Sequence, residues 1–445
     1  MTPVRGPRST LTRHTFEDED GTAWYNQPTY VLFVVGALVL NMFSGYWHLM
    51  GIPAPLDRLL LAAGLALMAL DPDVHARQRL RWLPLHWMML AFAGWATWSA
   101  AVHDTLIDAL GFYALIDRVI VPFALFCLGP LIFDRPSRRE LLLRALTVIG
   151  IYLGITGILE IAGPTSLVFP RYIMDPTVGI LFGRARGPFV AAEADGMVLA
   201  MCAVAAGVLY ARSQGIWRLI CTASLALGLT GAVLSMTRSI WLGAALAILI
   251  FAVMVPGVRK PLIKSGVWVM AVFLLVMTVI APAREALIDR LTTQRSLDDR
   301  ANTNAAALRI MAEQPLDGIG WARFLEEGTD WVRQADTYAI TTVNIEIHNV
   351  ILARAAELGI PATALWVAIV LLGPVRAIIR RQSGDLADFR LMAACFVAIW
   401  IVPTMFSPNP YPLPNNLFWL IGGIAAGWML LREPDPDPQP VPERR

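Results

Sequence analysis

Residues 216–256 read IWRLICTASLALGLTGAVLSMTRSIWLGAALAILIFAVMVP, two apolar blocks joined by a short turn that carries Arg238. Each block is close to the ~20 residues that an α-helix needs to cross ~30 Å of hydrocarbon. Blocks of this length recur along the chain. Hydropathy over windows of about 19 residues predicts twelve membrane spans, at 29–47, 54–70, 84–101, 115–133, 140–162, 188–210, 216–234, 239–256, 264–282, 350–373, 388–405 and 416–431.

The composition supports this membrane assignment. Of 445 residues, 56% are hydrophobic and 16% charged, whereas an average soluble domain has about 45–50% and 25%. A soluble cytoplasmic enzyme is therefore excluded, and we expect an all-α polytopic membrane protein with about twelve transmembrane helices. The net charge of +2 gives no reason to expect a nucleic-acid partner. All four cysteines lie in apolar blocks, where they behave as small hydrophobic residues.

Positive charge predicts the orientation, because arginine and lysine are retained on the cytoplasmic side of a membrane. With the N-terminus inside, the cytoplasmic segments carry 21 of the 36 basic residues, whereas the short outer connections carry Arg238 alone. We therefore expect both termini in the cytoplasm. The predicted order is an N-terminal segment at 1–28, nine helices within 29–282 with an outer loop at 163–187, an outer loop domain at 283–349, three helices within 350–431 and a disordered tail at 432–445.

The two longer outer loops break the charge rule. The first carries Arg171, Arg184 and Arg186, and the second carries seven arginines at 284, 290, 295, 300, 309, 323 and 333. Arginine is costly to translocate, so its presence outside suggests a function there. The alternative is a small folded cap in which these arginines pair with the acidic residues of the same loop.

The long loop has features of an ordered domain. Residues 302–314 read as an amphipathic helix that Asn302 or Thr303 caps and that ends before Pro315. A glycine turn follows, and we expect Trp321 and Phe324 after it to lie in the membrane interface. The loop closes with His348, which the next span holds at the outer surface.

His348 is the only histidine after position 103. A lone histidine at a helix start is more often a hydrogen-bonded structural residue than a catalyst. Several outer arginines around a neutral imidazole would, however, suit an anionic, phosphate-bearing substrate, because guanidinium groups match phosphate oxygens in bidentate fashion. The sequence has no HExxH motif and no GxxxxGK[ST] phosphate loop, so we expect no metal, no other cofactor and no ATP-driven work.

Four motifs in order resemble the bacterial O-antigen ligase and O-antigen polymerase family. Together with the spans they cover roughly residues 30–430, and they are Arg184-Ala-Arg-Gly-Pro-Phe189, Thr237-Arg-Ser-Ile-Trp241, the Pro-Leu-Asp-Gly-Ile-Gly core within 311–324, and His348-Asn-Val-Ile-Leu352 followed by Glu357-Leu-Gly-Ile360. One departure follows Phe189, where this chain reads Val-Ala-Ala-Glu-Ala-Asp-Gly and many relatives have asparagine-containing sequence.

The resemblance implies a glycosyltransferase of the GT-C-like helical class in the bacterial inner membrane. Its donor would be a glycan on undecaprenyl pyrophosphate, and its acceptor, at the periplasmic face, would be lipid A-core or a growing polysaccharide. The implied catalytic residues are His348, Arg238 and Arg300. Arg309 competes with Arg300, which we prefer because it precedes the amphipathic helix, and Arg186 and Arg184 are further candidates for binding pyrophosphate or glycan. By resemblance, the reaction would be a direct, metal-independent displacement with inversion.

Three acidic residues lie inside or beside the spans, where a carboxylate is costly and marks function by default. Glu193 and Asp195 point to nearly opposite faces of one helix, so both cannot line one pocket. Glu193 is a candidate for binding substrate, or for pairing with Arg186 if the helix begins early. Glu160, near the outer end of the fifth span, has the same two interpretations.

Three functions remain open on the sequence. A ligase would move finished O-antigen to lipid A-core in lipopolysaccharide biosynthesis, whereas a polymerase would join O-antigen or exopolysaccharide units on the carrier. A transporter of lipid-linked sugars is also commonly built from twelve spans. Transporters place their charged features near the bilayer midplane, whereas here the polar features gather at the outer face.

Overall fold

The computed structural model describes residues 23–72, 74, 79–255, 266, 267, 271, 274, 275, 278, 284, 285, 295–332 and 346–432. The expected segments that lie wholly or largely outside these residues are most of 1–28, the ninth span at 264–282, parts of the long loop, and the tail. The described residues are helical and contain no β-strand, only one isolated bridge between Leu80 and Leu431.

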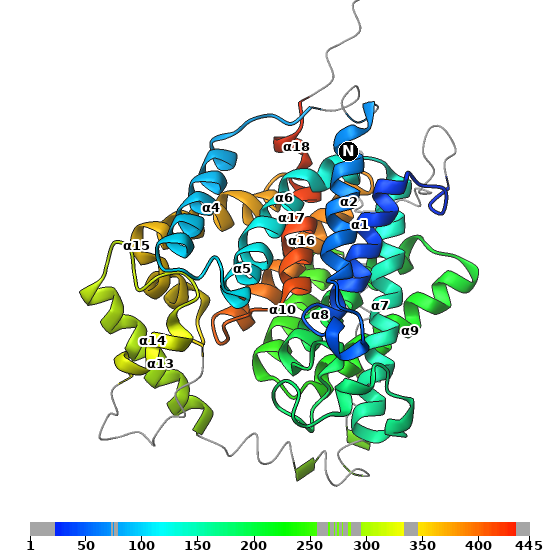
Figure 1. The fold of residues 1–445 in the computed structure, drawn as a ribbon. Helices are drawn as coiled ribbons and strands as arrows, with labels where there is room; N and C mark the ends of the chain where they lie inside the picture. The colour runs from blue at the N-terminus through cyan, green and yellow to red at the C-terminus, as the bar shows by residue number, and fades with distance from the viewer. Residues whose placement is uncertain are drawn as a thin grey trace, which may run out of the picture.

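The helices of the described residues form a bundle, with α13 and α14 at its side (Figure 1). The α-helices are α1 (Thr29–Leu40), α2 (Leu56–Leu70), α4 (Pro84–Val102), α5 (Ala109–Leu115), α6 (Val121–Ile132), α7 (Pro136–Ala162), α8 (Ala192–Arg212), α9 (Gly215–Leu234), α10 (Arg238–Met254), α13 (Arg295–Glu313), α14 (Phe324–Trp331), α15 (Val350–Val370), α16 (Leu386–Thr404), α17 (Pro412–Ala425) and α18 (Gly427–Leu430). Short 3₁₀ turns are η1 (Asn41–Phe43), η2 (Trp47–Met50), η4 (Thr165–Leu167), η5 (Arg171–Met174) and η6 (Gly187–Phe189), and π-helical turns are η3 (Ile116–Ile120) and η8 (Leu371–Val375).

Six helices in the described part of the chain are long and apolar enough to cross a membrane. They are Ala109–Ile132, Pro136–Ala162, Ala192–Arg212, Gly215–Leu234, Val350–Val375 and Leu386–Thr404. Shorter apolar helices cover Thr29–Phe43 and Arg238–Met254. The chain is therefore a multi-pass helical membrane protein. The expected boundaries shift in places: the fourth helix starts at Ala109 rather than at residue 115, and the last expected span begins at Pro412 and breaks at Ala426.

Helices α8 and α17 form the centre of the bundle. Helix α8 packs against α7, α9 and α16, and helix α17 packs against α6 and α16. Small residues allow the close approach that drives helix association in lipid. A Cβ on Gly423 of α17 would lie 2.2 Å from the carbonyl oxygen of Phe126 on α6, and one on Gly129 would lie 2.9 Å from the Leu420 side chain.

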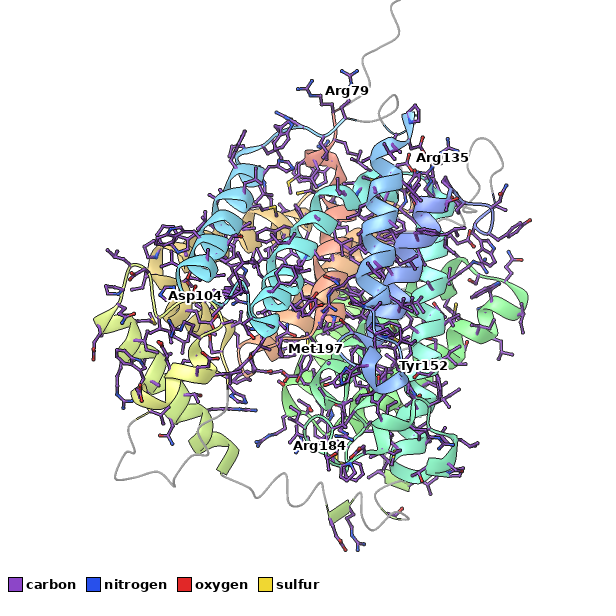
Figure 2. All side chains as sticks on the ribbon, in the orientation of Figure 1. Arg79, Asp104, Arg135, Tyr152, Arg184 and Met197 are labelled. Atoms are coloured by element: carbon purple, nitrogen blue, oxygen red, sulfur yellow. The ribbon has the colours of Figure 1, made fainter. Side chains whose placement is uncertain are left out.

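We call the end of the bundle at which α8 and α10 begin the Arg238 end. Figure 2 labels Arg184 near this end and Arg79 and Arg135 at the opposite end. The 163–187 connection folds back here as a small cap, in which Val168, Tyr172, Ile173 and Val190 form a separate apolar cluster.

The described part of the long loop packs on the side of the bundle, where α13 contacts α15 and α15 contacts α4 (Figure 1). The predicted helix at 302–314 is wrong at its start and right at its end, since α13 runs from Arg295 to Glu313. Asn302 and Thr303 are therefore inside the helix and do not cap it. Arg300 also lies within this helix instead of before it, because regular helix extends further upstream than the apolar pattern does.

A kink in α15 holds the glycine turn of the long loop. At Gly359 (φ +82°) the helix leaves regular geometry just before Pro361, which frees carbonyl groups of the preceding turn. The amide of Ile319 donates to the Ala356 carbonyl (2.9 Å) and the amide of Gly320 to the Glu357 carbonyl (3.0 Å). The Pro-Leu-Asp-Gly-Ile-Gly motif of the loop and the Glu357-Leu-Gly-Ile360 motif of α15 therefore form one hydrogen-bonded junction.

The predicted interfacial positions of Trp321 and Phe324 are wrong, because both side chains are buried within the protein. The Trp321 indole donates to the Gly111 carbonyl (3.1 Å), and the Arg354 guanidinium lies over its ring at 4.4 Å. An indole N–H that finds a protein carbonyl no longer needs the wet interface. Trp321 thus fastens the loop to α5 and α15.

Candidate functional site

Arg238 is the first residue of α10 and its side chain is exposed. The turn before it is fixed by local contacts: Met236 has a φ of +48°, and the indole of Trp241 donates to the Val233 carbonyl at 3.1 Å. The first amide groups of a helix have no partners within it and carry partial positive charge. A guanidinium at this position therefore adds to a local environment that already favours an anion.

Arg300, on α13, lies close to Arg238 and Glu193. Burial lowers the pKa of the Arg300 guanidinium, the Glu193 carboxylate raises it, and the Arg238 guanidinium lowers it. Three of the predicted residues, from α13, α8 and α10, therefore lie near one another at the Arg238 end. Two guanidinium groups and one carboxylate leave a net positive charge there.

His348 is half-buried and comes two residues before α15 begins. Asn349 fixes this helix start: its side-chain oxygen accepts from the Leu352 amide (3.1 Å) and its side-chain nitrogen donates to the Met405 carbonyl (3.4 Å). The cap sets the backbone at which the imidazole is attached. The histidine is thus positioned by a rigid helix terminus and not by a freely moving loop.

Tyr411 and Arg118 connect this histidine segment to the arginine pair. Arg118 of η3 forms an ion pair with Glu346, two residues before His348, at 2.9 Å. Burial raises the pKa of the Tyr411 hydroxyl well above its usual value, and the charges of Glu193 and Glu346 raise it further. Tyr411 is therefore within electrostatic range of both carboxylates.

Arg186 is fully buried in the cap, at 1% exposure. Its guanidinium donates to the carbonyl groups of Val178 (2.8 Å), Ile173 (2.6 Å) and Asp175 (3.2 Å). Burial lowers the pKa of this group. These contacts give Arg186 a structural role in folding the 163–187 loop.

The carboxylate of Glu160 completes this cap. It accepts from the amides of Arg186 (3.0 Å) and Gly187 (2.8 Å), at the end of α7. The early helix start that would let Glu193 pair with Arg186 is not found, since α8 begins at Ala192. Asp195 is fully buried on the other face of α8, as its spacing from Glu193 predicts.

The other two predicted arginines, Arg309 and Arg184, have other surroundings. Arg309 donates to the Trp331 carbonyl at 2.8 Å and so ties α13 to the end of α14. Arg184 is half-buried in the cap before η6. Arg300 therefore lies with Glu193 and Arg238, whereas Arg309 is tied to α14. The expected reason for preferring Arg300, a position before the helix, is wrong.

Sequence reasoning missed the charged residues inside the spans. Arg118 lies within the expected fourth span, and Arg354 and Glu357 form a buried pair in α15 at 3.3 Å. The signal was available, because an ionisable residue inside a membrane span marks function by default. The prediction applied that rule only to Glu160, Glu193 and Asp195.

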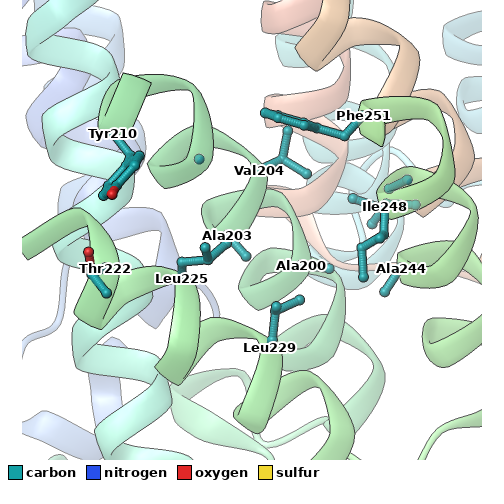
Figure 3. Close-up of a pocket in the computed structure, with 13 residues that line it drawn as sticks. Ala200, Ala203, Val204, Tyr210, Thr222, Leu225, Leu229, Ala244, Ile248 and Phe251 are labelled. Atoms are coloured by element: carbon teal, nitrogen blue, oxygen red, sulfur yellow. The ribbon is translucent and has the colours of Figure 1, made fainter. Parts of the chain in front are cut away.

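Two further observations concern what the charged site does not include. In the described part of the chain, no three histidine, cysteine, aspartate or glutamate side chains are grouped so as to hold a metal ion. An apolar cavity of about 150 Å³ lies between α8, α9 and α10 (Figure 3). Its lining includes the hydroxyl groups of Tyr210 and Thr222 but no charged side chain, so it is not part of the charged site.

The fold and site define a multi-pass helical membrane protein with a cationic site that α8, α10 and an inter-helical loop domain build together. Residues 223–367 match the family model for O-antigen ligase. This match supports the resemblance to the O-antigen ligase and polymerase family that the four motifs predict. The matched region contains Arg238, Arg300, Arg309 and His348, whereas Arg184, Arg186 and Glu193 precede it. No curated protein matches the chain.

Proposed function

We propose that the protein is an inner-membrane glycosyltransferase that moves a glycan from undecaprenyl pyrophosphate to an acceptor at the periplasmic face. The first candidate acceptor is lipid A-core, which makes the protein an O-antigen ligase. The observation that carries the proposal is the grouping of Arg238, Arg300 and Glu193, together with a family match that contains both arginines and His348.

The charges of the site suit the departure of a pyrophosphate. When the acceptor hydroxyl attacks the anomeric carbon, the bond from that carbon to the pyrophosphate oxygen breaks and negative charge grows on the leaving group. Arg238 and Arg300 would stabilise this charge, as preorganised donors do when they lower a barrier. Glu193 helps to hold Arg300 and contributes to binding pyrophosphate or glycan.

His348 is the proposed general base. A neutral imidazole accepts the proton of the attacking hydroxyl at neutral pH, because the ordinary pKa of histidine lies just below 7. Attack from the face opposite the leaving group inverts the anomeric configuration and needs no covalent enzyme intermediate. The arginines take the part that a metal ion often has, so we propose a metal-independent reaction.

The proposed orientation follows from the distribution of positive charge. It places both termini in the cytoplasm and the Arg238 end in the periplasm. The donor would reach the site within the membrane, and the acceptor sugar would reach it from the periplasmic side.

A polymerase of O-antigen or exopolysaccharide is the second candidate, because it needs the same donor and the same arginine and histidine set. A transporter is disfavoured by the location of the charges. Arg238 and Glu193 lie in the first turns of α10 and α8, at the Arg238 end. Transport sites are expected near the bilayer midplane instead.

The test uses purified protein in lipid with an undecaprenyl-pyrophosphate oligosaccharide, with and without lipid A-core, followed by a sugar-stained gel. One new band that requires lipid A-core identifies a ligase, and a ladder from the donor alone identifies a polymerase. His348→Ala should abolish either product. The matched control is His103→Ala, since His103 is a half-buried histidine whose Nδ1 lies 2.9 Å from the carbonyl oxygen of Ser99 in its own helix. Absence of product from folded wild type would overturn the transferase and favour the transporter.

A further inference from the structure

A groove of about 600 Å³ opens at the Arg238 end, beside the proposed site. Its lining comes from the connection between α1 and α2, from α5 and η3, and from the segment before α17. This volume falls in the range of ~300–1,000 Å³ that is typical of small-molecule sites. The arginines that we assign to the pyrophosphate, Arg238 and Arg300, do not line it.

Aromatic rings make up much of the groove wall. The lining residues with rings are Tyr46, Trp47, Tyr113, Phe189 and Tyr411, with His48 at the edge. Flat apolar faces of this kind pack against the C–H faces of a sugar ring, and the hydroxyl groups of tyrosine supply hydrogen bonds.

The charged residues of the groove come in opposite pairs. Arg58 forms an ion pair with Asp117, and its guanidinium lies over the Tyr113 ring at 4.5 Å. Arg118 is paired with Glu346. The groove therefore lacks the excess positive charge of the Arg238–Arg300 set. Paired guanidinium and carboxylate groups offer donors and acceptors side by side, which suits the vicinal hydroxyl groups of an uncharged sugar.

Buried hydrogen bonds hold the groove in shape. The carboxylate of Asp57 is 2% exposed and accepts from Asn41 (2.7 Å) and from the indole of Trp47 (2.8 Å). Asn416 of α17 donates in turn to Asn41 (3.2 Å). The wall is thus preorganised by side chains that have partners before any ligand arrives.

Through Arg118, the groove adjoins the segment that precedes His348. Arg118 lines the groove and binds Glu346, and Tyr411 lies near both Arg118 and Glu193. The base belongs next to the attacking hydroxyl and the arginines next to the leaving pyrophosphate. A sugar in this groove is therefore on the acceptor side of the reaction.

We propose that this groove binds the acceptor saccharide, with the Arg58–Asp117 pair on its hydroxyl groups and Tyr113 against its ring. The assignment rests on the proposed transferase, because it is the transferase that requires an acceptor. It adds a binding site for an uncharged sugar that is separate from the pyrophosphate site.

The experiment measures binding of donor-free lipid A-core, from the organism that makes the protein, to the full chain in lipid nanodiscs. Tyr113→Leu removes the ring and should weaken binding about tenfold. Phe112→Leu is the matched control, because Phe112 is an exposed aromatic of the same helix that does not line the groove. The control should bind as wild type does.

A double variant removes the Arg58–Asp117 ion pair without leaving one unpaired charge. Arg58→Met with Asp117→Asn should weaken binding at least tenfold and raise the KM for the acceptor while kcat changes less than about threefold. The control pair is Arg144→Met with Glu140→Gln, a similarly buried ion pair on α7. In both variants the affinity for the undecaprenyl-pyrophosphate donor should stay unchanged.

The outcomes separate the groove from the transferase. Weaker acceptor binding in the groove variants supports the groove as the acceptor site even if no glycan transfer occurs. In that case the proposed transferase function is wrong and the acceptor site stands. Transfer with unchanged acceptor affinity in both groove variants overturns the groove and leaves the function standing. Weaker binding of donor instead of acceptor, or no binding of lipid A-core by wild type, also overturns the proposal.

Discussion

At the scale of single residues, arginines with the same sequence signal have different roles. Arg300 is within electrostatic range of Glu193 and Arg238, Arg309 donates to the Trp331 carbonyl, and Arg186 is buried in the folded 163–187 loop. What separates them is whether each guanidinium faces other charges or backbone carbonyl groups. An exposed or charge-coupled arginine remains available to a phosphate, whereas one that satisfies several carbonyl groups does not.

Arg300 and Arg309 lie on the same helix and allow a matched comparison. We expect Arg300→Met to lower the rate of glycan transfer about 100-fold, the usual cost of removing one group that stabilises developing charge. Arg309→Met should change that rate less than about threefold. Initial rates with saturating donor and acceptor measure both variants. Equal losses of transfer rate in the Arg300→Met and Arg309→Met variants would mean that both arginines serve the folding of α13 and that Arg300 has no separate role in transfer.

Arg186 should matter for stability and not for chemistry. We expect Arg186→Met to lower the free energy of unfolding by about 2–3 kcal/mol, because buried carbonyl groups lose a charged donor. The readout is thermal unfolding in detergent, with the exposed cap residue Arg171→Met as control. If the Arg186→Met variant had wild-type stability and no activity, Arg186 would bind substrate and not stabilise the fold.

At the scale of elements, the kink of α15 decides where the long loop lies. A Cβ on Gly359 would be 2.1 Å from the carbonyl oxygen of Leu316. The left-handed backbone at Gly359 and the missing side chain are therefore both needed for the junction that places α13 and His348 relative to one another.

Gly359→Ala should disrupt this junction, with a loss of more than about 2 kcal/mol in unfolding free energy and faster proteolysis near residues 315–321. Gly384 is a matched control, since its φ is +65° but nothing lies within 4 Å of an added Cβ. Gly384→Ala should show only the backbone strain, about 1 kcal/mol. Similar proteolysis in both variants would argue against the interlock.

At the scale of the whole molecule, composition and block length predicted the helical membrane class and most helix positions, because a bilayer imposes length and hydrophobicity directly. The family motifs also led to the proposal that Arg238, Arg300 and His348 form the site, which stays a prediction. Sequence could not place Trp321, since only the fold shows that Gly111 supplies its partner. It also missed the groove, because Arg58, Arg118 and Tyr411 come from separate segments of the chain that meet only in three dimensions.

The proposed orientation makes a direct prediction about labelling. A cysteine in place of Arg171 should react with an impermeant maleimide in intact spheroplasts, whereas one at Gln214 should react only after permeabilisation. Both native residues are exposed, and they lie at opposite ends of the bundle. Three native cysteines, Cys202, Cys221 and Cys395, are buried, and the variant is made with the partly exposed Cys127 replaced by Ser to keep background low. The reverse pattern would place the Arg238 end in the cytoplasm.

The central claim is that Arg238 and Arg300 act together on one leaving pyrophosphate. The direct test is a double-mutant cycle on kcat/KM for glycan transfer, using Arg238→Met, Arg300→Met and the double variant. If both arginines stabilise the same transition state, the double variant should lose little more activity than the worse single variant. Losses that multiply, or a single variant with wild-type activity, would contradict a shared site.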